Sequence, residues 1–293
     1  MLRLVMKFGV KNLVLLGSGE SLNHVVPHLP ENPDIKTLAL QRVFPYCHKM
    51  FGVVPDYWNW FDANGSLEGL EYILKNHQSV DFKKMVILIP KFVCESYQHY
   101  RKFAGTTPLG RNPADWDLKY RSLLDQVEKI VEVKKFDATT TKRIALADDI
   151  KNRDLSRYDI HESEAYIRFM NDDVLFGTVR FDSEKVIGTT FKWGMESKLS
   201  SVMFPVAYYL KAKNVYVCGV DFKGGRFYDK TRSRHAWGKD VKEINPAVKY
   251  ALSLISKWTE WQDIHGMTIN SLAPKELSLL SNVLPVVDVR EIT

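Results

Sequence analysis

Short apolar runs that stop at a turn-forming residue recur along the sequence and predict buried strands. Residues 12–17 (NLVLLG) and 214–219 (NVYVCG) are continuously apolar rather than alternating, as in parallel sheets covered on both faces. Further strands are predicted over residues 37–40, 56–62, 85–90, 267–270 and 286–289.

Between these runs, apolar residues three and four positions apart predict helices. The predicted helices cover residues 21–28, 67–74, 118–131, 195–210, 246–261 and 275–280. Strand–helix alternation at both ends of the chain predicts an α/β fold: a Rossmann-like, mostly parallel sheet with helices on both faces. We find no repeat and no linker, so residues 1–293 are expected to form one nucleotide-binding domain. The less regular segment 112–185 predicts an inserted lid or a small helical subdomain, and the pattern does not choose between them.

Composition narrows the class of protein further. Hydrophobic residues at 45% and charged residues at 26% are globular values. A net charge of +6 suits an anionic ligand but does not imply nucleic acid. Cys47, Cys94 and Cys218 lie far apart without a CxxC motif, which argues against a zinc site and favours a reducing compartment. No stretch has the apolar length of a secretion signal or a membrane span, so we expect a soluble cytoplasmic protein.

The first candidate ligand segment is G-S-G-E-S-L at residues 17–22, directly after a predicted strand. Its glycines predict close approach of the backbone to a ligand, with Ser18 and Ser21 as hydroxyl donors and Gly19 in the turn. The helix that follows would point free N–H groups at the same ligand. The alternative is an ordinary strand-to-helix turn in which Ser21 is the N-cap.

A second candidate lies at residues 61–66, where Asp62 and Asn64 could hydrogen-bond a base or a ribose. The alternative here is a plain Asn-Gly turn with Ser66 as the N-cap of the next helix.

The third candidate, residues 218–238, is the richest in charge. Asp221 sits just past a buried strand, where a carboxylate needs a partner. Five cations surround Tyr228 and His235: Lys223, Arg226, Lys230, Arg232 and Arg234. Such a loop could neutralise a phosphate, with His235 titrating near neutral pH. A solvated basic loop is the alternative.

These motifs together resemble a known clan. The opening G-S-G-E-S-L resembles the G-x-G-P-S-L of the small bacterial sialyltransferases (glycosyltransferase family 42, with a GT-A-variant fold) and of the MptE-like proteins, which include 6-hydroxymethylpterin diphosphokinases. Residues 200–222 resemble the helix–strand–G-x-D-F segment of the sialyltransferases, and H-A-W-G at 235–238 resembles the H-A-x-G of the MptE-like proteins. The resemblance covers roughly residues 12–66 and 186–288.

The resemblance implies roles for individual residues. It assigns the cytidine nucleotide of CMP-sialic acid to Ser18, Gly19, Ser21, Gln41, and Asp62 or Asn64. It places Lys223 and Tyr228 where the family's two phosphate-binding tyrosines stand, and His235 where its general base stands. Two positions depart from the pattern: Glu20 replaces a proline and Gln41 an asparagine.

The expected function is therefore a metal-independent, inverting glycosyl transfer from a CMP-sugar, with no cofactor and with Arg226 helping the leaving phosphate. The partners expected are the nucleotide-sugar donor and a glycan or lipid-linked acceptor, with peripheral membrane contact for the latter and no nucleic acid. The alternative is Mg²⁺-dependent pyrophosphoryl transfer from ATP to a pterin, with Asp221 and Asp229 as metal ligands. A third hypothesis is a nucleotide-binding protein without catalysis.

One expectation concerns the motion of the basic loop. Its cations repel one another, so residues 223–238 are expected to be mobile when empty and to order over the nucleotide phosphate, against part of 112–185. The alternative is a rigid loop held in the core by Phe227 and Trp237.

Overall fold

The computed structural model describes residues 9–59, 63–90, 113–136, 179–180, 186–187, 199, 203–222, 226–228, 246–260, 262 and 266–293. Predictions that fall on other residues, including those for Lys223, His235, Trp237, Asp62 and Asp229, lie outside this part of the chain.

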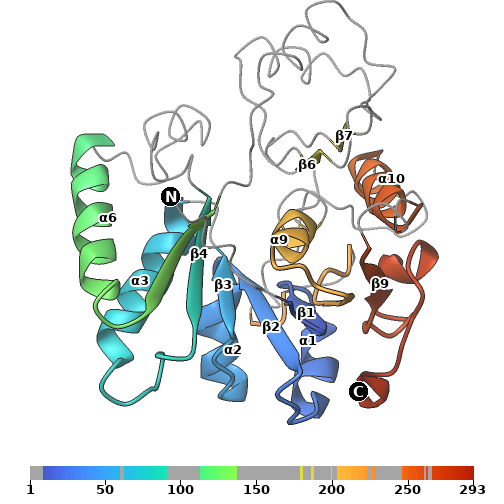
Figure 1. The fold of residues 1–293 in the computed structure, drawn as a ribbon, viewed down its shortest axis with the longest axis horizontal. Helices are drawn as coiled ribbons and strands as arrows, with labels where there is room; N and C mark the ends of the chain where they lie inside the picture. Colours follow the sequence, from blue (N-terminus) through green and yellow to red (C-terminus); the bar gives the residue numbers. More distant parts are fainter. Residues whose placement is uncertain are drawn as a thin grey trace, which may run out of the picture.

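The described strands form one open, parallel sheet of seven strands in the order β5-β4-β3-β2-β1-β8-β9 (Figure 1). Their bounds are β1 Asn12–Leu16, β2 Ile35–Leu40, β3 Tyr57–Asn59, β4 Val86–Pro90, β5 Glu132–Phe136, β8 Asn214–Cys218 and β9 Thr268–Ser271. β6 (Val179–Arg180) and β7 (Val186–Ile187) form a separate antiparallel pair. β1 pairs with β2 on one side and β8 on the other, so the strand order reverses at the β1–β8 boundary.

The helices form layers on the two faces of this sheet, as right-handed crossovers in opposite directions from β1 require. Their bounds are α1 Leu22–Val25, α2 Val43–Phe51, α3 Ala63–Asn76, α6 Pro113–Val127, α9 Phe204–Tyr209 and α10 Pro246–Glu260. α3 packs against α2 and α6, whereas α9 and α10 lie together away from them (Figure 1). Among the described residues, no helix combines the length and apolarity that crossing a membrane would need. The predicted α/β, Rossmann-like class with helices on both faces is confirmed.

Aromatic side chains fill both layers. On one face Phe44 of α2 lies against Trp58 of β3, with ring centroids 5.1 Å apart. On the other, Phe204 of α9 lies against Trp258 of α10 at 5.4 Å. Trp58 and Trp258 are fully buried. A Cβ at Gly69 of α3 would collide with the Trp58 ring, so this glycine lets α3 approach β3 closely.

Several predicted elements need correction. The predicted strand 286–289 is wrong: Val286 makes an isolated bridge to Ser271, and the 3-10 helix Val289–Glu291 follows under a cap by the Asp288 side chain. The predicted helix 275–280 is instead a turn followed by the 3-10 helix Leu279–Asn282, whose cap is Ser278. The helix predicted to reach Val131 ends at Val127.

The segment 112–185 divides at residue 136. Its first part forms α6 and β5, and β5 pairs with β4 as the last strand of the sheet. Apart from residues 179–180, the remainder lies outside the described chain. The inserted lid or helical subdomain therefore stays a prediction for residues after 136.

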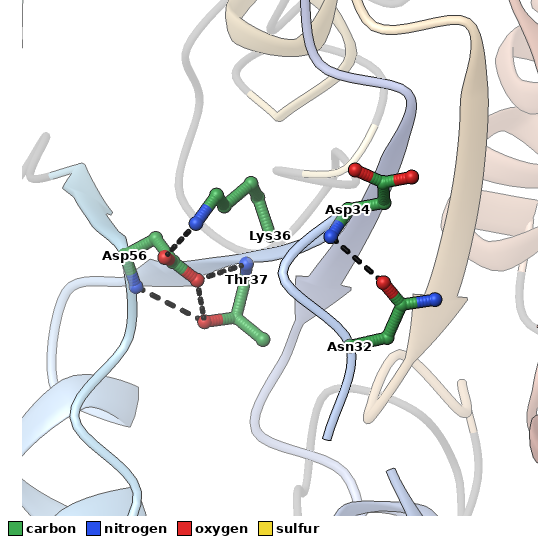
Figure 2. Close-up of polar contacts among 5 residues, drawn as sticks. All are labelled: Asn32, Asp34, Lys36, Thr37 and Asp56. Carbon is green, nitrogen blue, oxygen red and sulfur yellow. Dashed lines mark hydrogen bonds and ion pairs between the residues drawn. The ribbon is translucent and has the colours of Figure 1, made fainter. Parts of the chain in front are cut away.

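A polar cluster joins three strands at the end of the sheet where they begin (Figure 2). The Asp56 carboxylate accepts hydrogen bonds from the Thr37 backbone N–H at 2.9 Å and the Thr37 hydroxyl at 3.1 Å, and it pairs with Lys36 Nζ at 3.0 Å. The Asp56 carbonyl accepts from the N–H of Val86 in β4 at 2.8 Å. Asp56 thus ties together the starts of β2, β3 and β4, far from the carboxyl ends where ligands bind in open α/β sheets.

Candidate functional site

Two loops interlock where the strand order reverses. The loop after β1 contains Ser21 and the loop after β8 contains Gly219 and Asp221. Ser21 Oγ donates to Asp221 Oδ1 at 2.5 Å and accepts from the Gly219 N–H at 2.8 Å. The Ser21 N–H donates to Asp221 Oδ2 at 2.8 Å. Ser21 and Asp221 are buried, and a carboxylate this deep is stabilised by the hydrogen bonds it accepts.

The glycines of these two loops allow the loop backbones to pack closely against each other. An added Cβ at Gly17 would collide with the Gly219 carbonyl, and one at Gly19 with the Asp221 carboxylate. Gly219 has a φ of +71°, which favours glycine. The sequence assigned Gly17 and Gly19 to the approach of a ligand, whereas the structure shows that packing between the loops already requires them.

The predicted free N–H groups at the start of α1 are not free. Those of Leu22, Asn23 and His24 donate to the carbonyls of Gly19, Glu20 and Ser21, and that of Ser21 donates to Asp221. α1 also has four residues, too few for a useful helix dipole. Ser21 does occupy the N-cap position, but its hydroxyl bonds to Asp221 and Gly219 in the loop after β8 rather than capping the helix. The prediction that this helix start offers free N–H groups is therefore wrong, whereas nucleotide binding at Ser18, Gly19 and Ser21 stays a prediction.

Residues 226–228 run along the first loop. Arg226 forms an antiparallel bridge with Gly19, and the Phe227 N–H donates to the Ser18 carbonyl at 3.1 Å. Phe227 is 3% exposed and its ring lies 5.8 Å from that of Phe51 in α2. Phe227 is thus held in the core. This agrees, for this residue, with the alternative prediction of a rigid loop.

This path brings two predicted phosphate-binding residues to the carboxyl edge of the sheet. Arg226 Nη1 donates to the Tyr228 hydroxyl at 2.9 Å, and the guanidinium lies 5.7 Å from the Tyr228 ring centroid. Gly19 is the bridge partner of Arg226, and the carbonyl of Ser18 accepts from the Phe227 N–H. Four of the predicted residues therefore lie together. Lys223 and His235, predicted for the same loop, are not in the described chain.

The ends of β2 and β3 carry two buried amides. Gln41 follows β2 with a φ of +51°; its N–H donates to the Asn59 carbonyl and its own carbonyl accepts from the Trp58 indole, both at 2.8 Å. Asn59, the last residue of β3, is fully buried and donates from Nδ2 to the Leu88 carbonyl at 2.9 Å. Within the described chain, Asn59 Oδ1 has no hydrogen-bond partner.

Asn59 is the candidate that sequence reasoning missed. Its signal was a polar residue closing a strand inside an aromatic run, Y-W-N-W-F. The sequence favoured Asp62 and Asn64 instead. Asn64 and Ser66 lie in the first turn of α3, which begins at Ala63, so the predicted Asn-Gly turn and the Ser66 N-cap are wrong.

The two described cysteines are unsuited to nucleophilic chemistry. Burial raises the pKa of the Cys47 thiol to about 12 and raises that of Cys218 well above its ordinary value. Among the described residues, no three His, Cys, Asp or Glu side chains gather as metal ligands. Asp221, predicted to bind a ligand or Mg²⁺, directs its carboxylate oxygens at Ser21.

Comparison with known proteins returns structures but no sequence family. No family model matches the chain, and neither does any curated protein. The monofunctional α-2,3-sialyltransferase Cst-I from Campylobacter jejuni is 14% identical, with 99% of this chain and 84% of that chain covered and a TM-score of 0.46. The sialyltransferase CstII from the same organism, in complex with a substrate analogue, is 13% identical, with 97% and 88% covered and a TM-score of 0.45. At these identities the likeness assigns no role to any residue of this chain.

Proposed function

We propose that this chain is a glycosyltransferase that uses a nucleotide sugar, with a CMP-sugar of the sialic acid type as its donor. One observation carries the proposal: the two motif segments of the sequence resemblance, which contain Ser21 and Asp221 and lie 200 residues apart, interlock where the strand order reverses. Ligands of open α/β sheets bind at this position, beyond the carboxyl ends of the strands.

The chemistry follows from the groups gathered there. Arg226 and Tyr228 offer a guanidinium and a hydroxyl at this edge, which suits the charge that develops on a leaving phosphate. His235 would take the proton of the acceptor hydroxyl while the sugar–phosphate bond breaks and the new glycosidic bond forms on the opposite face. The roles of His235 and Lys223 rest on the sequence resemblance alone.

The nucleoside would lie beside the ends of β1, β2 and β3, near Ser18, Gly19 and Gln41. The buried Asn59 Oδ1 is an unpaired acceptor within the described chain, and it favours a ligand that donates a hydrogen bond. Cytosine carries an amino donor at N4 where uracil carries an oxygen acceptor. Uracil also has a donor, at N3–H, so this supports CMP over UMP where the N4 position of the base faces Asn59.

Isothermal titration with CMP, UMP and GDP tests the donor. We expect CMP to bind at least about tenfold more tightly than UMP, which corresponds to roughly 1.4 kcal/mol. In Asn59→Ala this preference should shrink while residual binding persists. Equal affinities in the unaltered protein would overturn the donor assignment.

Turnover tests the class of reaction. We expect transfer from a CMP-sugar that survives EDTA and is abolished in His235→Ala; loss of activity with EDTA would contradict the metal-independent mechanism.

The second candidate, pyrophosphoryl transfer from ATP to a pterin, is favoured by H-A-W-G at 235–238 and needs Mg²⁺ held by carboxylates. Its candidate ligand Asp221 is buried against Ser21. Mg²⁺-dependent ATP consumption with a pterin, and none with a CMP-sugar, would replace our proposal. Unchanged turnover in His235→Ala would contradict both proposed reactions, glycosyl transfer and pyrophosphoryl transfer.

A further inference from the structure

A pair of stacked tyrosines joins the candidate site to α2. The rings of Tyr46 in α2 and Tyr228 have centroids 4.0 Å apart and an interplanar angle of 8°. Tyr228 belongs to the segment 226–228, whose backbone bonds to the loop after β1. The stack is therefore a side-chain link between α2 and the edge where Arg226 and Tyr228 lie.

Neighbouring rings and cations already lie against the two tyrosine rings. Tyr228 covers one face of Tyr46, and Lys49 Nζ lies 4.9 Å from the Tyr46 centroid. On the Tyr228 ring, the Arg226 guanidinium lies at 5.7 Å and Phe227 packs edge-on at 5.0 Å. Because cations and rings occupy these faces, the pair is poorly suited to stack a nucleobase. The part of the pair that can still offer a hydrogen bond is the Tyr228 hydroxyl.

Tyr46 is itself held by α3. Its hydroxyl hydrogen-bonds Glu68, and Glu68 pairs with Arg42 Nε at 3.0 Å. Burial, and next Glu68, raise the pKa of Tyr46, so its hydroxyl keeps its proton near neutral pH. Tyr46 is thus a surface, held by α3, against which the Tyr228 ring stacks.

The Tyr228 hydroxyl accepts one hydrogen bond and can donate another. It accepts from Arg226 Nη1 at 2.9 Å, and it donates to no other group in the described chain. A phenol that accepts from a guanidinium still has a proton to offer. We propose that Tyr46 is a positioning residue that holds the Tyr228 hydroxyl and the Arg226 guanidinium in the geometry that receives an anionic group of the substrate. The part of this inference that concerns substrate rests on the proposed function.

The test compares Tyr46→Leu, which removes the stack, with Tyr46→Phe, which keeps it. The first readout is hydrogen exchange at the Phe227 amide, whose bond to Ser18 reports whether segment 226–228 is docked. An aromatic pair is worth enough to change an equilibrium roughly two- to tenfold. We expect exchange at Phe227 to quicken by that factor in Tyr46→Leu and to stay within about twofold of the parent in Tyr46→Phe. Lys49→Gln is the matched control, because it removes the neighbouring cation and leaves both rings, and it should behave as Tyr46→Phe does.

The second readout is transfer from a CMP-sugar. Tyr46→Leu should lower kcat roughly two- to tenfold with little change in the acceptor KM, and Tyr46→Phe should restore it. In Tyr228→Leu the further change Tyr46→Leu should have little additional effect, because Tyr46 acts through Tyr228.

An unchanged exchange rate of the Phe227 amide in Tyr46→Leu would overturn the inference. So would a Tyr46→Phe variant that changes exchange or kcat as much as Tyr46→Leu does. So would additive losses of kcat in the double variant. If exchange responds as expected while the parent protein transfers no sugar, the positioning contact stands and the proposed function falls.

Discussion

Ser21 and Asp221, 200 residues apart, hold two loops together by hydrogen bonds to each other. Each stands in the loop after a strand beside the candidate site, and the Asp221 carboxylate accepts from both the hydroxyl and the N–H of Ser21. Their bonds fix the two loops that present Ser18, Gly19 and Arg226 at the edge of the sheet. The sequence assigned both to nucleotide binding, and that assignment stays a prediction; what the structure adds is a reason for both residue types that needs no ligand.

Replacing Ser21 by alanine should destabilise the fold measurably. The change leaves the Gly219 N–H and the Asp221 carboxylate each short of one partner at a buried position. Each unsatisfied buried group costs about 1–3 kcal/mol, so for the two groups we expect the free energy of unfolding, measured in urea, to fall by about 2–6 kcal/mol. Ser281→Ala is the control, since Ser281 Oγ only donates to the nearby Ser278 carbonyl, and it should change stability by less than about 1 kcal/mol. Equal losses in the two variants would refute this account.

The cysteines give a second expectation for single residues. Because burial holds the pKa of Cys47 at about 12 and raises that of Cys218, neither forms an appreciable thiolate at pH 8 in the folded protein. In Cys94→Ser, titration with a chromogenic disulfide should find no rapidly reacting thiol before unfolding and two after addition of guanidinium. A fast thiol in the folded variant would show that one of these side chains opens to solvent.

The candidate site was only partly predictable because its contacts join distant residues. Glycine and serine after an apolar run marked the loop after β1, and an aspartate after another such run marked the loop after β8. Nothing in either segment indicates that Ser21 bonds Asp221, since 200 residues separate them. Asn59 was passed over because a single asparagine inside the aromatic run Y-W-N-W-F does not by itself show that its side chain is buried with an unpaired oxygen.

At the level of elements, the sequence predicted best where burial alone decides. The continuous apolar runs became β1, β2, β4, β8 and β9 within about two residues of their predicted ends. α2 had no such signal, because Pro45 and several aromatic residues are poor helix formers. Pro45 is tolerated in the first turn, where backbone N–H groups have no helical partner, and Gly52 ends the helix at a φ of +70°.

β5 was missed for the opposite reason. Among the described strands, Glu132–Phe136 pairs with β4 alone, and this edge strand carries Glu132, Lys134 and Lys135 in place of an apolar run. Charged residues on an edge strand also discourage pairing with other chains. The sequence therefore offered no buried run by which this strand could be predicted.

The Asp56 cluster provides a prediction for elements rather than for one contact. Asp56→Ala removes two hydrogen bonds and an ion pair between the starts of β2 and β3, and should lower the free energy of unfolding by about 1–3 kcal/mol. Asp34→Ala is the matched control, because Asp34 is exposed and pairs loosely with Lys11 at 3.6 Å (Figure 2 shows both aspartates). It should cost no more than about 1 kcal/mol. If both variants lost the same stability in urea, the cluster would have no special role in joining the strands.

For the whole molecule, the strand order is the feature that the sequence left open. Alternating strands and helices predict parallel strands, and the preferred hand of crossovers limits the topologies. Neither rule says that β8 returns to pair with β1, as Asn214 pairs with Asn12 and Cys218 with Leu16. That return creates the β1–β8 boundary, and with it the position of the candidate site.

The shared strand also predicts how the protein unfolds. β1 is hydrogen-bonded to β2 on one side and β8 on the other, and the loops beyond β1 and β8 interlock through Ser21 and Asp221. Unfolding either wing of the sheet would therefore expose β1 and break this contact. We expect native-state hydrogen exchange at rising urea to give amides of β2 and β8 the same opening free energy and the same urea dependence. Ser21→Ala should lower both values equally, by the amount measured in global unfolding. Earlier opening of β8 and β9, with β2 and β3 still protected, would show instead that the two wings are separate cooperative units.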